Sequence, residues 1–276
     1  MEFRTIVNVP KPSFLIEPLE HLFFVGSCFA DSIGRRFAEE HFNVVTNPFG
    51  VMYNPASVLH TIQQWLQLHD SQGGEVMPRI VFITLGTNHV YRLKENGQIV
   101  DNCQKRPQSL FVEEELSVAQ CADFLLQAAD EMYRRSSDVC IVLTVSPIRY
   151  AKYGFHGSQL SKATLLMAAE EVCRQRSFIG YFPAYEIVLD ELRDYRFYQP
   201  DMIHPSQQAV EYIWERLVEV YFSERAKQFL RDWQPIKEAL NHRPFHPESD
   251  EYQSFLAQAK QREANLTTYY QSQLKH

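Results

Sequence analysis

With 276 residues, 45% of them hydrophobic, the chain is long enough for one substantial core with an appendage. Its formal net charge of −7 and the lack of a Lys/Arg run argue against the basic surface typical of nucleic-acid binding. No apolar run is long enough for a signal-peptide core or a membrane span, so we expect a cytoplasmic protein without a membrane partner.

Short apolar runs alternate with amphipathic segments through the first 222 residues. The runs predict strands at residues 21–25, 44–45, 80–85, 139–145 and 178–182. Helices are predicted after Ser27, after the Asn54-Pro55 cap, after the Ser117/Gln120 capping box, at about 158–174, and after Pro205. A hairpin turning at Asn96-Gly97 interrupts the alternation. This order predicts an α/β fold with a mostly parallel five-stranded sheet covered on both faces.

The composition of the sequence changes after Phe222. Pro235, Pro244 and Pro247 punctuate a polar helical stretch, and residues 250–273 predict one more helix. We therefore expect an α/β domain at residues 1–222 and a C-terminal helical extension at residues 223–276. The extension could pack on the core or join subunits in a homo-oligomer.

Residues with useful chemistry follow the predicted strands. Parallel sheets bind ligands at the carboxyl ends of their strands. The residues at these ends are Gly26-Ser27-Cys28, Gly50, Gly86-Thr87-Asn88 and Ser146, and Asp201 and His204 come just before Pro205. A nucleophile, oxyanion donors and an acid/base pair are the parts of an acyl-transfer site.

These motifs resemble those of the GSCFA-domain family. The matching segments are Gly26-Ser27-Cys28-Phe29-Ala30, Asn47-Pro48-Phe49-Gly50, Thr84-Leu85-Gly86-Thr87, Ser146-Pro147-Ile148-Arg149, Ser161-Lys162-Ala163, residues 192–198 and residues 201–204. The resemblance covers roughly residues 20–220. It implies kinship with the SGNH/GDSL hydrolases, and hence a three-layer α/β/α, flavodoxin-like fold. It also implies a small-molecule or carbohydrate ester as substrate.

The SGNH pattern also implies the roles of single residues. Its Asp-x-x-His falls on Asp201 and His204, with His204 as general base oriented by Asp201. Its oxyanion-hole glycine and asparagine fall on Gly50 and Asn88. His89 stands where the pattern has an acid, and we count it among the candidate substrate-binding residues.

The first block of the pattern leaves two candidate nucleophiles. SGNH enzymes read Gly-Asp-Ser there, whereas this chain has Ser27 second and Cys28 third. The strict alignment selects Cys28, and a helix N-terminus stabilises a thiolate more directly than it activates a serine. A shift of one residue would select Ser27, and Cys28 would then be a packing residue.

Two basic residues complete the candidate site. Arg149 and Lys162 could bind a carboxylate or phosphate of the substrate, or form surface salt bridges. No phosphate-binding glycine loop is present, so we expect no cofactor. His242 and His246 have metal-ligand spacing, but Pro244 between them breaks the helix that would align them, so we expect no metal.

Three functions fit these residues. The first is an SGNH-like esterase or deacylase that forms an acyl-enzyme. The second is an acyltransferase with the same Cys/Ser-His-Asp site, since a thioester can be intercepted by nucleophiles other than water. The third is a non-catalytic ligand-binding module on an SGNH scaffold, in keeping with the altered first block and His89.

Overall fold

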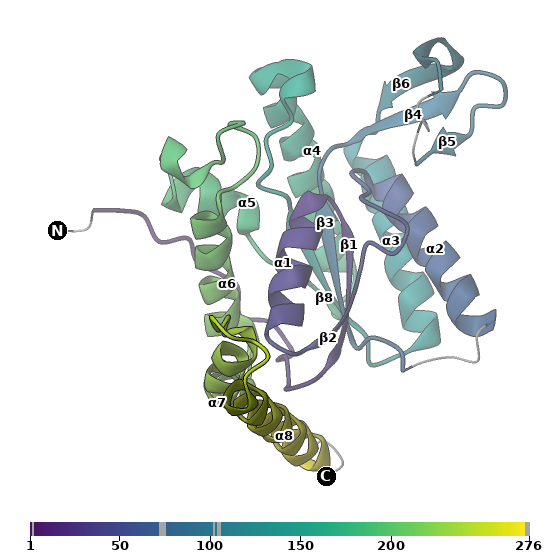
Figure 1. The fold of residues 1–276 in the computed structure, drawn as a ribbon. Coiled ribbons are helices and arrows are strands. Elements are labelled where there is room, and N and C mark those ends of the chain that lie inside the picture. The colour runs from purple at the N-terminus through teal and green to yellow at the C-terminus, as the bar shows by residue number, and fades with distance from the viewer. Residues whose placement is uncertain (2, 72–75, 102, 104–105, 274–276) are drawn as a thin grey trace.

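A five-stranded parallel sheet forms the centre of the protein (Figure 1). The computed structural model describes residues 1, 3–71, 76–101, 103 and 106–273. The sheet has the order β2-β1-β3-β7-β8, and each neighbouring pair is parallel. Its strands are β1 (His21–Gly26), β2 (Asn43–Thr46), β3 (Ile80–Leu85), β7 (Cys140–Val145) and β8 (Ile179–Tyr181). The predicted five-stranded parallel sheet is confirmed.

Helices cover both faces of this sheet (Figure 1). They are α1 (Cys28–Glu39), α2 (Pro55–Ser71), α3 (Val118–Arg135), α4 (Gly154–Gln175), α5 (Ala184–Glu186), α6 (Gln207–Tyr221), α7 (Glu224–Asn241) and α8 (Asp250–Gln273), with short turns η1 (Gln108–Leu110), η2 (Ala151–Tyr153), η3 (Ile187–Glu191) and η4 (Tyr195–Phe197). Side chains of β1 alternate between the faces. Leu22 and Phe24 join the cluster under α1 and α6, and Phe23 and Val25 join the cluster under α2, α3 and α4. The predicted three-layer α/β/α architecture is confirmed.

Local side-chain caps start several helices where the sequence predicts them. Asn54 accepts a hydrogen bond from the Ser57 amide at 2.9 Å at the start of α2. Ser117 and Gln120 form the predicted capping box of α3. In contrast, α4 begins at Gly154, earlier than predicted, and no side chain caps its first turn. A helix start without a capping residue leaves no local signal in the sequence.

A second, smaller sheet extends from the carboxyl end of β3. Its order is β5-β4-β6, with β4 (His89–Leu93), β5 (Ile99–Val100) and β6 (Phe111–Glu115), and both pairings are antiparallel. The predicted hairpin at Asn96-Gly97 is confirmed, with Gly97 at a φ of 71°. β6 is not among the predicted strands, because it ends in three glutamates, which are depleted in strands.

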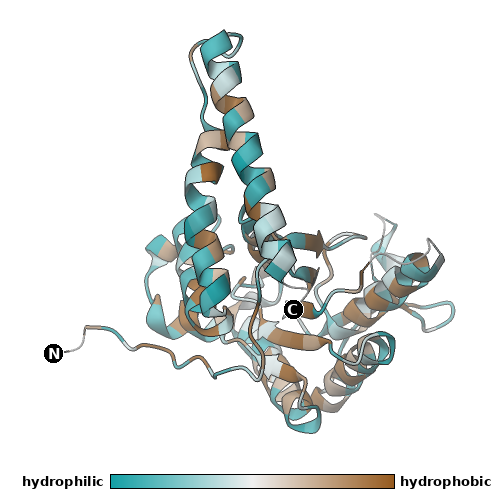
Figure 2. Cartoon of the chain, turned by 90° about the horizontal axis from the view of Figure 1, so that it is seen from below, coloured by the Kyte–Doolittle hydropathy of each residue, from teal (hydrophilic) through white to brown (hydrophobic). Residues whose placement is uncertain are grey.

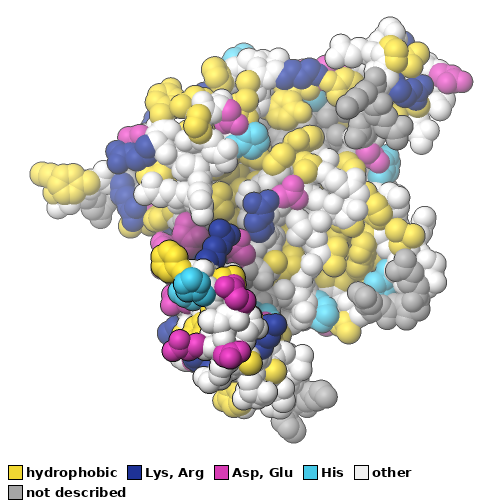
Figure 3. All heavy atoms as spheres, viewed as in Figure 1, with side chains coloured by type: hydrophobic (Ala, Val, Ile, Leu, Met, Phe, Trp, Pro, Cys, Tyr) yellow, Lys and Arg dark blue, Asp and Glu magenta, His cyan; other side chains and the backbone are white. Residues whose placement is uncertain are grey.

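The helices α7 and α8 form a hairpin that projects from the α/β core (Figure 2). Phe229, Trp233 and Ile236 of α7 are buried in the same cluster as α1 and α6, whereas α8 buries Ala259 and Tyr270. Acidic and basic side chains mix over this hairpin (Figure 3). The last three residues of the predicted extension lie outside the described ranges. No described helix combines the length and apolar content that a membrane crossing needs.

The aromatic cluster around Phe37 supplies a test of the core. We predict that Phe37→Ala lowers the free energy of unfolding by about 3–5 kcal/mol, because a buried ring leaves a cavity when it is removed. Phe37 is fully buried among the rings of Phe24, Phe42, Phe82, Trp214 and Phe222. Urea unfolding followed by circular dichroism measures the change.

The fully exposed Phe245 is the control, and Phe245→Ala should stay within about 0.5 kcal/mol of wild type. Equal stability of the two variants would contradict this core.

Candidate active site

The turn after β1 places Ser27 and Cys28 at the carboxyl edge of the sheet. Gly26 has a φ of 134°, and a Cβ there would lie 2.1 Å from the carbonyl oxygen of Thr84 on the neighbouring strand β3. The Ser27 amide donates to that carbonyl oxygen at 3.0 Å and to the Thr84 Oγ1 at 2.9 Å. This turn therefore requires glycine at position 26 and holds the start of α1 against β3.

Ser27 is the N-cap of α1 and is 1% exposed. Its Oγ accepts a hydrogen bond from the Phe29 amide at 3.3 Å and lies 2.9 Å from the Thr84 Oγ1. Both contacts direct the hydroxyl into the protein. In this arrangement Ser27 serves as a helix cap, and no surface of the hydroxyl is open to a substrate.

Cys28 is the first residue of α1 and is half-buried. Its Sγ lies 3.4 Å from the Oη of Tyr53, which comes from the segment between β2 and α2. The Tyr53 carbonyl accepts hydrogen bonds from the Gly86 and Thr87 amides at 2.8 and 2.9 Å. The pKa of Tyr53 is raised well above its usual value. Burial is the largest cause, and the hydrogen bond with Cys28 is the second. Sequence reasoning missed Tyr53, because a contact across 25 residues has no local signal.

Asp201 and His204 form a hydrogen-bonded pair on the loop before α6. The His204 Nδ1 lies 2.6 Å from the Asp201 Oδ2. The Asp201 Oδ1 accepts from the amides of Ile203 at 2.8 Å and His204 at 3.0 Å. Together these hydrogen bonds lower the pKa of Asp201 to about 2. The bond from the His204 side chain is the largest cause. With Nδ1 donating to the carboxylate, the Nε2 of His204 is left as the basic atom.

Arg149 ties this loop to the end of β7. Its amide donates to the Ile203 carbonyl and its Nη1 to the Met202 carbonyl, each at 3.0 Å. The guanidinium also lies over the rings of Phe155 and Tyr198, 4.1 and 5.3 Å from their centroids. These contacts make Arg149 a support for the acid/base loop, and its role in substrate binding stays a prediction.

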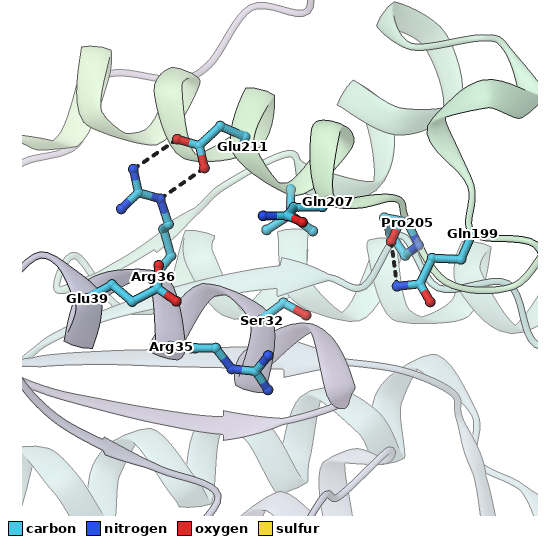
Figure 4. A pocket seen from close by; sticks show the side chains of 9 residues that line it. Ser32, Arg35, Arg36, Glu39, Gln199, Pro205, Gln207 and Glu211 are labelled. Atoms are coloured by element: carbon cyan, nitrogen blue, oxygen red, sulfur yellow. Dashed lines mark hydrogen bonds and ion pairs between the residues drawn. The ribbon is translucent and has the colours of Figure 1, made fainter. Parts of the chain in front are cut away.

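A cleft of about 320 Å³ lies between α1 and α6 (Figure 4). Ser32, whose hydroxyl donates to the Cys28 carbonyl at 3.2 Å, lines one side, and Pro205, next to His204, lines the other. Arg36 spans the cleft to Glu211 through two hydrogen bonds of 3.0 and 2.9 Å. In the described part of the chain no hydrogen bond joins His204 to Cys28 or Ser27. The predicted contact of the base with a nucleophile is therefore not formed in this state.

The two predicted oxyanion donors are engaged elsewhere. The Gly50 amide donates to the Asn47 carbonyl at 2.9 Å within a turn. The Asn88 Nδ2 donates to the Leu116 carbonyl at 2.8 Å, and the side chain is 3% exposed. In this state turn formation and pairing with the segment before α3 use these donors.

Lys162 and His89 are also buried. The Lys162 Nζ donates to the carbonyls of Gly86 and Ser146, both at 2.8 Å, so it joins the ends of β3 and β7. His89 stacks on Tyr153 with 3.6 Å between ring centroids, and burial lowers its pKa. In this state both side chains are held by contacts within the protein, and their roles in substrate binding stay predictions.

The chain matches two family models. The model of the GSCFA family matches residues 21–79 and 75–217, and the model of the C-terminal domain of GSCFA domain proteins matches residues 233–273. The first match includes the turn at Cys28 and the loop of Asp201 and His204. No curated protein matches the chain.

Several solved structures are similar to the chain at low identity. A member of the lipolytic protein G-D-S-L family from Veillonella parvula is 12% identical, with a TM-score of 0.48 over 73% of this chain and 98% of its own. An acetylxylan esterase from Geobacillus stearothermophilus is 13% identical, with a TM-score of 0.46 over 76% and 98%. A carbohydrate esterase family 3 protein from Talaromyces cellulolyticus is 11% identical, with a TM-score of 0.43 over 77% and 99%.

Burial of Lys162 makes stability depend on pH. Burial lowers the pKa of Lys162 to about 7, whereas a lysine in an unfolded chain titrates near about 10.4. Between these values the unfolded chain binds more protons, so raising the pH favours the folded state. We predict that the free energy of unfolding of wild type, minus that of Lys162→Met, rises over this range by up to about 1.4 kcal/mol per pH unit.

Urea unfolding at a series of pH values measures this difference. Lys94 is exposed, so Lys94→Met is the control and should follow wild type at every pH. If the difference in free energy of unfolding between wild type and Lys162→Met did not change with pH, the lowered pKa of Lys162 would be contradicted.

Proposed function

The chain belongs to the GSCFA family, and we propose that it is an esterase or deacylase that forms an acyl-enzyme on Cys28. The observation that supports the proposal is that Ser32, one helical turn after Cys28, and Pro205, next to His204, line the same cleft. Ser27, the alternative nucleophile, is buried as the cap of α1. A thiol at the N-terminus of a helix is in the position where the free amides and the helix dipole favour a thiolate.

The reaction needs His204 as a base and then as an acid. The thiol proton of Cys28 passes to the Nε2 of His204 while Sγ attacks the carbonyl carbon of the ester, whose π electrons move to oxygen. When this adduct collapses, the C–O bond breaks and the leaving alcohol takes the proton from His204. Water then attacks the thioester with His204 as base, which releases the acid and restores the thiol. Asp201 stays ionised and stabilises the imidazolium.

The separation of His204 from Cys28 does not conflict with this mechanism. Catalytic hydrogen bonds are often long in empty sites and shorten in the substrate complex. His204 is carried by an exposed loop, with 38% of its side chain accessible, whereas the turn at Cys28 is fixed to β3. We therefore infer that the loop with His204 moves to bring Nε2 to Sγ, while the turn at Cys28 stays in place.

The lining of the cleft supports an ester of a polar alcohol, such as an acylated carbohydrate. Ser32, Gln199 and Gln207 present hydroxyl and amide groups to it. The charges of Arg36 and Glu211 neutralise each other across it (Figure 4). Such a surface suits hydroxyl groups better than a long acyl chain.

Acyl transfer to an acceptor other than water is the second candidate function. It rests on the same observation, Cys28 as the accessible nucleophile, because thioesters react readily with amines and thiols. Transfer from a coenzyme A thioester to an added acceptor, without hydrolysis of p-nitrophenyl acetate, would favour it. Tight ligand binding without turnover would instead favour a non-catalytic module.

The nucleophile is tested by substitution of Cys28. We predict that Cys28→Ala abolishes hydrolysis of p-nitrophenyl acetate and the labelling of this site by iodoacetamide, because both need the sulfur. His204→Ala should slow turnover by about 10²–10⁴, the usual contribution of a general base. Mass spectrometry after a short reaction should locate the acetyl group on residue 28.

Two variants serve as controls. Ser27→Ala should keep most of the activity and lose about 1 kcal/mol of stability, since it removes a helix cap. His246→Ala changes an exposed histidine of the C-terminal hairpin and should behave as wild type. An inactive Ser27→Ala beside an active Cys28→Ala would move the acyl group to Ser27, and full activity in both would rule out this turn as the site.

A further inference from the structure

Two of the oxyanion donors that the sequence motifs indicate have acceptors within the protein. Negative charge develops on the carbonyl oxygen when Sγ attacks, and donors placed around that oxygen stabilise it. The Gly50 amide and the Asn88 Nδ2 are both bonded within the protein. The Cys28 amide remains, because the first amide of a helix has no acceptor within the helix. A single amide leaves the hole incomplete.

Tyr53 supplies a second donor at the right place. Its hydroxyl is 3.4 Å from Sγ. Among the described residues, Tyr53 is the side chain within hydrogen-bond distance of this thiol. The carbonyl oxygen and the sulfur share one carbon in the tetrahedral adduct. A hydroxyl in contact with the sulfur is therefore close enough to donate to an oxyanion that forms on the same side of the sulfur.

The position of this hydroxyl is fixed from two sides. The Tyr53 backbone is held to the end of β3 by the amides of Gly86 and Thr87. Its ring meets the edge of the Tyr150 ring, with 5.9 Å between centroids. A donor that is held in place before the reaction needs no reorganisation when charge develops.

The hydroxyl also keeps its proton. Burial raises the pKa of Tyr53, and the neighbouring Cys28, Tyr150 and Asp31 act in the same direction. At neutral pH the phenol is therefore an O–H donor to a thiolate or an oxyanion, and it does not exchange its proton with either.

We propose that the Tyr53 hydroxyl and the Cys28 amide together form the oxyanion hole of this site. In the free protein the Tyr53 hydroxyl lies 3.4 Å from the Cys28 Sγ. During attack it donates to the carbonyl oxygen, and no bond to Tyr53 is made or broken. This proposal rests on the proposed acyl-enzyme function, but the contact of Tyr53 with the thiolate can be measured without any ester.

Tyr53→Phe tests the proposal, because it removes the hydroxyl and keeps the ring. Without the donor the thiolate is less stable, so the midpoint of iodoacetamide alkylation of Cys28 against pH should rise by about one unit. With p-nitrophenyl acetate, kcat should fall by about 10²–10³ while KM changes little, the pattern of an interaction formed in the transition state. Tyr133→Phe is the matched control, since Tyr133 is an exposed tyrosine of α3 whose ring stacks on Phe178. It should leave both measurements within about threefold of wild type.

The two measurements separate the possible failures. An unshifted alkylation midpoint in Tyr53→Phe would overturn the contact with the thiolate. A shifted midpoint with unchanged kcat would overturn the oxyanion role. If wild type itself does not hydrolyse the ester, the proposed function fails, and a shifted midpoint would still support Tyr53 as the donor to Cys28. Urea unfolding of Tyr53→Phe confirms that the variant is folded when the rates are measured.

Discussion

The contact between Thr84 on β3 and the turn after β1 is the constraint on which the candidate site depends. Thr84 accepts both hydrogen bonds of the Ser27 amide and contacts the Ser27 hydroxyl. The close approach of its carbonyl to Gly26 excludes any other residue there. Because Ser27 is held toward the interior, the next residue begins the helix with its side chain on the other side. In the proposed mechanism the pairing of these two strands therefore favours the Cys28 thiol over the Ser27 hydroxyl.

Buried polar side chains of α4 extend this constraint along the edge of the sheet. Ser161 bonds to the Asn88 amide and to the Thr87 hydroxyl, and the Lys162 ammonium bridges the ends of β3 and β7. Buried polar groups are costly unless they are paired, so the strand ends and α4 hold one another in place. Tyr53 is attached to this same rigid edge through the amides after β3. The donors proposed for the oxyanion hole therefore belong to the least adaptable part of the site.

The acid/base loop is held in a different way. Asp201 and His204 are partly exposed, and their loop is fixed to the core mainly by Arg149. The α1–α6 cleft separates this loop from the rigid edge, with Arg36 and Glu211 joined across it. A thiol is more acidic than a hydroxyl, so it needs less help from its base than a serine does. In the proposed mechanism this makes a looser base compatible with a fixed nucleophile.

The sequence alone was sufficient for features that depend on neighbours along the chain. The five strands, the hairpin at Asn96-Gly97, the caps at Asn54 and Ser117, and the spacing of Asp201 and His204 all arise from local patterns of burial, turns and hydrogen bonding. The partners of single side chains were decided only by the tertiary structure. Asn88 is bonded to a carbonyl 28 residues away, Lys162 to one 76 residues away, and Cys28 meets a tyrosine 25 residues away. A polar side chain that packing buries must take the partner that the fold brings to it, and no pattern along the chain specifies which partner that will be.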